Sequence, residues 1–278
     1  MKSRALATPL SFNENLASYL SYLNRALKAN FAYKSSTFLG LFTGALSYGI
    51  TVLVWRHVYA QGGLAHALSA NEMFSYLALA FCLNYAMTIN IDQRVGQRIR
   101  LGLIATDLLK PLDFQLTQAV QALSDSLFNG FVGLGVLAVV YTVLGSAILP
   151  KNLACLVLFL PSVFLAFVVQ YSIVFLFIQG AFYTYSGYGL FASRIALHQT
   201  FSGLQAPLIL YPPILLTLGR WLPFQHIIYS PISIYMGRVE GLQALNLLGE
   251  QFLWATVLYL VGHYTLRKAL GQLEIQGG

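Results

Sequence analysis

Few side chains in this sequence have the types and spacing that chemistry requires. A serine nucleophile at Ser202 would need a histidine base, and His263 is the only suitable histidine in the chain. No two histidines have the spacing of metal ligands, and no pair of carboxylates lies within an apolar run. A glycine-rich phosphate-binding loop is also absent. We therefore expect no catalytic site, no metal site and no ATP hydrolysis by this chain.

A basic stretch, Gln97–Pro111, lies between two apolar runs and has the composition of a helix that contacts a partner. Apolar residues recur along it at helical spacing, so one face packs while the other shows charge. The closing proline ends that helix, because proline lacks the N–H group and restricts the residue before it. The alternative is a basic loop that only follows the positive-inside rule. The residues assigned to the contact are Arg94, Arg98, Ile99, Arg100, Gly102, Leu103, Leu108, Lys110 and Pro111.

The composition indicates which kind of element positions these residues. Of 278 residues, 57% are hydrophobic and only 9% are charged, whereas soluble domains average about 25% charged residues. Because these few charges cannot cover a water-exposed surface, most of the protein's surface is expected to face lipid. The net charge of +7 does not indicate nucleic acid, because the cations cluster at the ends of apolar runs. Cys82 and Cys155 lie inside such runs and are expected to be packed thiols.

The apolar runs predict an all-α membrane protein with six spans in one transmembrane domain, residues 1–278. Each span needs roughly 20 apolar residues. Before the first span, leucines recur at spacings of three and four, which predicts an amphipathic helix lying flat at the membrane surface. We expect this interfacial helix at 11–34 and spans at 36–55, 73–91, 124–144, 153–185, 190–219 and 252–266.

The fifth of these spans is expected to be broken. Five of the nine prolines lie between Pro207 and Pro231, and a regular helix cannot hold several of them without freeing carbonyl groups. Within a membrane those groups must be satisfied by protein or water. We therefore predict a re-entrant segment that faces a cavity or the outer surface and serves as a gate. The residues assigned to it are Ser202, Gly203, Pro207, Pro212 and Pro213.

Aromatic side chains gather in the inner part of the fourth run. Amphipathic rings suit a wet passage or one lined by amphiphiles, so Tyr171, Phe175 and Tyr183 are candidates for lining a transport pathway. The alternative is ordinary packing against neighbouring helices and lipid. The cations also predict the orientation, because twelve lysines and arginines fall on one side of the six-span arrangement and four on the other. Both termini are therefore expected in the cytoplasm.

Four segments together resemble one family. They are IRLGLIATDLLKPL (Ile99–Leu112), FSGLQAPLILYPPIL (Phe201–Leu215), LPFQHIIYSPISIYMG (Leu222–Gly237) and the end Gln276-Gly277-Gly278. In this order and spacing they resemble a family of uncharacterised ABC exporter permeases, membrane subunits of the second export class with six spans.

The resemblance implies a permease subunit in the bacterial inner membrane. It implies a dimer of such subunits, identical or paralogous, docked on two copies of a separate ATPase that binds ATP and magnesium. The basic stretch would then be a coupling helix seated on the ATPase, and transport would proceed by alternating access. The scarcity of charge within the spans favours an amphiphilic or lipid-linked cargo. The competing hypotheses are a membrane scaffold or assembly protein that transports nothing, and an intramembrane enzyme.

Overall fold

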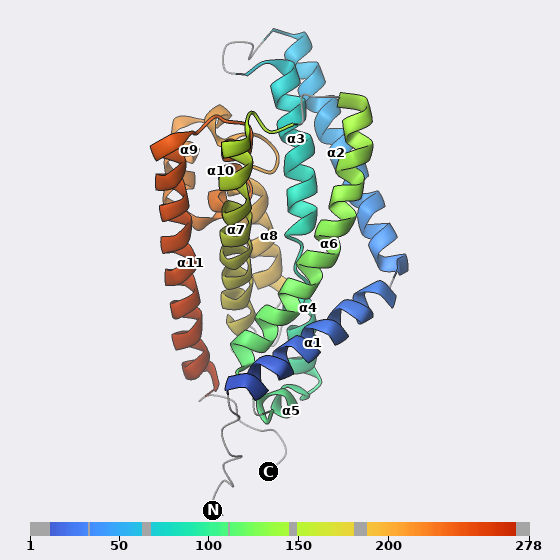
Figure 1. Cartoon of the computed structure of the whole chain (residues 1–278), viewed down its shortest axis with the longest axis vertical. Helices are drawn as coiled ribbons and strands as arrows, with labels where there is room; N and C mark the ends of the chain where they lie inside the picture. Colours follow the sequence, from blue (N-terminus) through green and yellow to red (C-terminus); the bar gives the residue numbers. More distant parts are fainter. Residues whose placement is uncertain are drawn as a thin grey trace, which may run out of the picture.

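The computed structural model describes residues 12–32, 34–62, 68–110, 112–144, 149–180 and 188–270, which form helices and turns without a strand. Five helical stretches in this part are long and apolar enough to cross a membrane. In Figure 1 they run along the long axis of the molecule. They are Thr37–Ala60 in α2 (Lys34–Ala60), Ala70–Arg100 in α3 (Ala70–Ala86) and α4 (Ile91–Arg100), Phe114–Ala138 in α6 (Phe114–Leu144), Leu153–Gly180, which is α7, and Gly241–Lys268 in α11 (Gly241–Leu270).

The described part therefore holds five membrane-crossing stretches rather than the six that we expected. The missing one is the predicted fifth span, 190–219. Its first part is α8 (Tyr188–Phe201), whose 14 residues rise only about 21 Å, against about 30 Å of bilayer hydrocarbon. Short helices follow, because prolines prevent one continuous helix. They are η2 (Leu208–Leu210), α9 (Pro213–Trp221), η3 (Pro223–His226) and α10 (Tyr229–Tyr235).

The helix ends also differ from those predicted, and polar residues extend α6 and α11 beyond their apolar runs. Asp113 caps α6 by accepting a hydrogen bond from the backbone N–H of Leu116 (2.8 Å), so this helix begins ten residues before 124. Helix α11 begins at Gly241 rather than at 252. Helix α3 ends at Ala86 rather than at 91. Helix α7 is described to Gly180, and the predicted end of that span lies outside the described residues.

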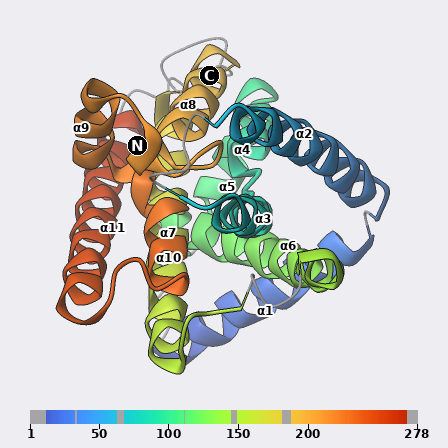
Figure 2. The same cartoon turned by 90° about the horizontal axis from the view of Figure 1, so that it is seen from above.

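The helices of the body are arranged on two sides of a central pair. Figure 2 shows α7, α10 and α11 on one side and α2 on the other, with α3 and α6 between them. Helix α1 (Phe12–Ala32) crosses the lower part of α6 in Figure 1. It packs through the buried Ala26 and through Phe31, whose ring meets that of Phe128 edge to face, whereas Leu16 and Leu20 of the predicted leucine stripe are exposed. Such a helix suits a membrane surface, because its exposed apolar side chains can enter lipid.

Candidate functional site

In its described part, 97–110, the basic stretch holds the end of one helix and a second short helix, so the prediction of one helix over Gln97–Pro111 is wrong. Helix α4 ends at Arg100 and α5 spans Ile104–Leu108. Between them Gly102 has a φ of 69°, a left-handed conformation that glycine adopts without the steric cost of a Cβ atom. We call this helix–turn–helix, residues 91–110, the hairpin. In Figure 1 it lies at the end of the molecule where α1 begins and α11 ends.

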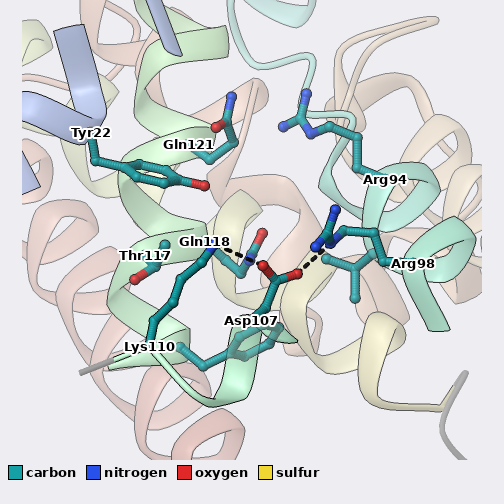
Figure 3. A pocket seen from close by; sticks show the side chains of 10 residues that line it. Tyr22, Arg94, Arg98, Asp107, Lys110, Thr117, Gln118 and Gln121 are labelled. Carbon is teal, nitrogen blue, oxygen red and sulfur yellow. Dashed lines mark hydrogen bonds and ion pairs between the residues drawn. The ribbon is translucent and has the colours of Figure 1, made fainter. Parts of the chain in front are cut away.

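A single carboxylate holds the two arms of the hairpin together. The Nε group of Arg98 on α4 donates to Asp107 on α5, and the Nζ group of Lys110 donates to the same carboxylate over 2.8 Å. Figure 3 shows both contacts. Burial raises the pKa of Asp107, but the hydrogen bonds and charges of Lys110 and Arg98 outweigh burial and bring that pKa below its ordinary value. Two of the cations that we predicted to face a partner are thus engaged within the hairpin.

The outer end of the hairpin is apolar and exposed. Leu101 is 68% exposed, Leu103 42% and Leu109 84%; we call these three leucines the hairpin tip. Ile104 between them is buried and anchors the turn. In a protein whose long helices face lipid, exposed leucines on a turn at one end of the molecule are unusual, because water penalises their exposure. They indicate a surface that another molecule covers.

The other predicted contact residues are divided between the two surfaces of the hairpin. Ile99 and Leu108 are half-buried and pack against the core. Arg100 is exposed beside the hairpin tip, and Arg94 is half-buried. Pro111 lies outside the described residues. The hairpin therefore brings together part of the predicted set, while Ile99 and Leu108 serve to attach it to the body.

An ion pair that sequence analysis missed fixes the start of the hairpin. The Nη2 group of Arg194 on α8 lies 2.5 Å from the Oδ2 atom of Asp92 in the first turn of α4. Both residues are buried. Nothing in the local sequence links Arg194 to a carboxylate 102 positions away. The only signal for this pair in the sequence is that Arg194 and Asp92 carry opposite charges.

A second ion pair ties the hairpin to α6 and α1. The Nη2 group of Arg94 lies 2.6 Å from the Oδ2 atom of Asp125, a buried residue of α6. The side-chain amide of Asn30 on α1 donates to the Oδ1 atom of Asp125 and to the hydroxyl of Ser124, each over 3.1 Å. A displacement of the hairpin would therefore strain contacts to α1, α6 and α8 together.

The segment that follows α8 is held by close backbone contacts. The hydroxyl of Tyr76 on α3 donates to the carbonyl of Gly203 (2.7 Å), and the N–H of Tyr229 donates to the carbonyl of Ser202 (2.9 Å). Gly203 has a φ of 85°, and a Cβ atom added there would lie 2.6 Å from the tyrosine hydroxyl oxygen. The indole N–H of Trp55 on α2 donates to the carbonyl of Gln205 (2.9 Å). This turn therefore joins α2, α3 and α10.

The prolines of the segment mark where its short helices begin. Pro207 and Pro212 are extended residues that precede η2 and α9, and Pro213 occupies the first turn of α9. Proline suits these positions, because its fixed φ fits the first turn and its missing N–H costs no hydrogen bond there. The chain is thus interrupted at the predicted prolines, while the role of this segment as a gate stays a prediction.

The aromatic residues predicted to line a pathway are packed inside the protein. Tyr171 and Phe175 on α7 are buried. Phe175 packs on Tyr171 and on Phe114 of α6, and the hydroxyl of Tyr171 donates to the carbonyl of Gln115. Tyr183 lies outside the described residues. In this conformation the two described side chains hold α6 and α7 together, so a pathway here requires these helices to separate.

Comparison with known proteins identifies one family. Over residues 45–277 the chain matches the family described as "ABC-2 family transporter protein". No curated protein matches the chain. Among the described residues, no group of three or more histidine, cysteine or acidic side chains is arranged to hold a metal ion.

Proposed function

This chain belongs to the ABC-2 family of transporter proteins, and from that membership we propose that it is the permease of an ATP-driven exporter. With five membrane-crossing stretches among the described residues, this family member is a multi-pass membrane subunit of an ABC transporter. We further propose that it works by alternating access, that it forms half of the translocation path, and that a second permease copy or a paralogue supplies the other half. ATP and magnesium would bind to a separate ATPase subunit.

The observation that carries the proposal is the hairpin tip. Its exposed leucines lie in the turns on either side of α5, beyond the second membrane-crossing stretch, which ends at the exposed Arg100. A groove on an ATPase would cover the leucines and remove them from water, at about 25 cal/mol for each Å² of apolar surface buried. The Arg98–Asp107–Lys110 contacts would hold the turn in the shape that enters the groove. Arg98 and Lys110 would thus support docking mainly through the shape of the hairpin.

The two ion pairs behind the hairpin would transmit motion of the ATPase to the neighbouring helices. When ATP closes the ATPase subunits, the hairpin would move with them. Asp92–Arg194 would carry that motion to α8, and Arg94–Asp125 would carry it to α6 and α1. Because α8 leads directly into the Gly203 turn, the interrupted segment is well placed to act as the gate. This arrangement requires both termini and the hairpin on the cytoplasmic side of a bacterial inner membrane.

Co-purification with the ATPase tests this function. A tagged chain, co-expressed with the ATPase, should retain it, and Leu101→Asp combined with Leu109→Asp should abolish its retention. Leu149→Asp is the matched control, because Leu149 is also an exposed leucine (55%) and lies between α6 and α7, away from the hairpin. Full retention by the double variant would refute docking at the tip. If the unaltered chain retains no ATPase, the scaffold alternative is favoured.

A further inference from the structure

A polar cavity lies between the hairpin, α1 and α6. Helices α1, α4 and α6 and the residues around α5 enclose about 220 Å³, far more than the roughly 10–15 Å³ that one water needs. Figure 3 shows its side chains. It is lined by Tyr22, Arg94, Val95, Arg98, Asp107, Lys110, Phe114, Thr117, Gln118 and Gln121.

The cavity carries an excess of positive charge. Three cations line it, Arg94, Arg98 and Lys110, against one carboxylate, Asp107. Asp125 pairs with Arg94 from outside the cavity, and one positive charge remains in excess even when this carboxylate is counted. The three cationic side chains are 38%, 40% and 47% exposed, so their charge is accessible to a ligand. The cavity therefore favours an anion.

Several hydrogen-bond donors in the cavity have no partner among the described residues. The phenol of Tyr22 and the amides of Gln118 and Gln121 make no hydrogen bond to other described residues, although all three line the space. Arg94 uses only its Nη2 group in a described contact, and a guanidinium carries five N–H donors in all. Guanidinium, amide and phenol donors converging on one space match the several acceptor oxygens of a phosphate group.

The surroundings indicate that this phosphate belongs to a lipid. Leu16 and Leu20 on α1 and Leu116 on α6 are exposed apolar residues of helices that line the cavity, although they lie outside its lining. The exposed leucines of α1 suit a helix at the membrane surface, where the cavity that it lines would lie at the level of the lipid headgroups. The cytoplasmic leaflet is also rich in anionic lipids, which attract basic clusters at the membrane surface.

We infer that the cavity between α1, the hairpin and α6 binds the phosphate of an anionic phospholipid from the cytoplasmic leaflet. The bound headgroup would bridge α1 to the hairpin, in addition to the Asn30–Asp125 contact. The inference depends on the membrane placement of the chain and not on transport, so it can hold even if the ATPase docks elsewhere.

Native mass spectrometry of the purified full-length chain tests the inference. The chain in detergent is titrated with phosphatidylglycerol and, separately, with phosphatidylcholine carrying the same acyl chains. Phosphatidylglycerol should bind more tightly. We expect Arg98→Gln, and separately the pair Gln118→Leu with Gln121→Leu, to weaken its binding about tenfold. Arg267→Gln is the matched control, because it removes one cation from the end of α11 near the same end of the molecule without touching the cavity.

Further measurements distinguish a bound lipid from other ligands of the cavity. Glycerol 3-phosphate, which has the phosphate but no acyl chains, should not compete at the same concentrations; equal competition would indicate a site for a soluble anion and overturn the inference. Equal binding of the two lipids would also overturn it, as would unchanged binding by both cavity variants. If those variants bind lipid normally but lose the ATPase, the cavity serves the protein partner instead. The circular dichroism spectrum and the elution volume of each variant must match those of the unaltered chain. The Gln118→Leu and Gln121→Leu pair is a second test, because it removes hydrogen-bond donors without removing charge.

Discussion

Arg194 on α8 and Asp92 on α4 form an ion pair buried among apolar helices, with 2.5 Å between Nη2 and Oδ2. Charges in such surroundings are costly unless they are paired. The pair joins the element that begins the interrupted segment to the element that begins the hairpin. It is therefore both a structural requirement and the most direct connection between the two candidate sites.

Breaking this pair on one side should destabilise the protein strongly. Arg194→Met or Asp92→Leu leaves one buried charge without its partner, at a cost of about 3–5 kcal/mol. The double variant should lose much less than the sum of the two, because it removes both charges. Thermal unfolding of the purified chain in detergent measures this, with the exposed Lys151–Glu240 pair as the control. Additive losses in the double variant would contradict a direct interaction.

The turn at Gly203 should not tolerate a methyl group. Gly203→Ala combines an unfavourable backbone conformation, about 1–3 kcal/mol, with a Cβ atom 2.6 Å from the tyrosine hydroxyl oxygen of Tyr76. Gly241→Ala is the matched control, because Gly241 also has a positive φ, of 56°, but has open space around the added atom. A lower melting temperature for the first variant than for the control isolates the close approach. Equal melting temperatures would show that the turn relaxes freely.

Asp107 provides a test of how the hairpin supports coupling. Asp107→Asn should loosen the hairpin, because Arg98 and Lys110 lose the carboxylate that both contact. If shape is what matters, stimulation of the ATPase by the permease should fall in this variant. If Arg98 and Lys110 instead contact acidic groups of the ATPase, freeing them should preserve or raise stimulation. In both cases Arg98→Glu with Lys110→Glu should uncouple ATP hydrolysis from transport, and unchanged coupling would exclude both roles.

The contribution of Asp107 should depend on pH in a defined direction. Its pKa is held below the ordinary value of 3.8. A carboxylate whose pKa is depressed on folding contributes stability above its unfolded pKa and loses it as the pH falls through the folded pKa. Hydrogen–deuterium exchange of residues 98–110 should therefore show a constant difference between the unaltered chain and Asp107→Asn from about pH 5 upward. A difference that declines between pH 7 and 5 would contradict this assignment.

The local sequence was sufficient for the features that depend on neighbouring residues. Long apolar runs predicted the membrane-crossing helices, because burying a backbone in lipid requires helical hydrogen bonds within each segment. The prolines after Phe201 predicted an interrupted segment, because a proline frees carbonyl groups wherever it stands within a helix. The helix ends were less accurate, since caps such as Asp113 extend a helix into polar sequence that hydropathy does not detect.

Only the tertiary structure decided which distant side chains meet. Arg194 and Asp92 are 102 residues apart, and Arg94 and Asp125 are 31 apart; each pair forms because helix packing brings two elements together, which no local pattern encodes. The same holds for the hairpin, where spacing predicted one helix and the turn at Gly102 instead divides it and leaves Leu103 exposed. Composition and local chemistry thus determined a helical membrane protein with a broken segment, whereas long-range packing determined which charges are paired and which leucines remain exposed.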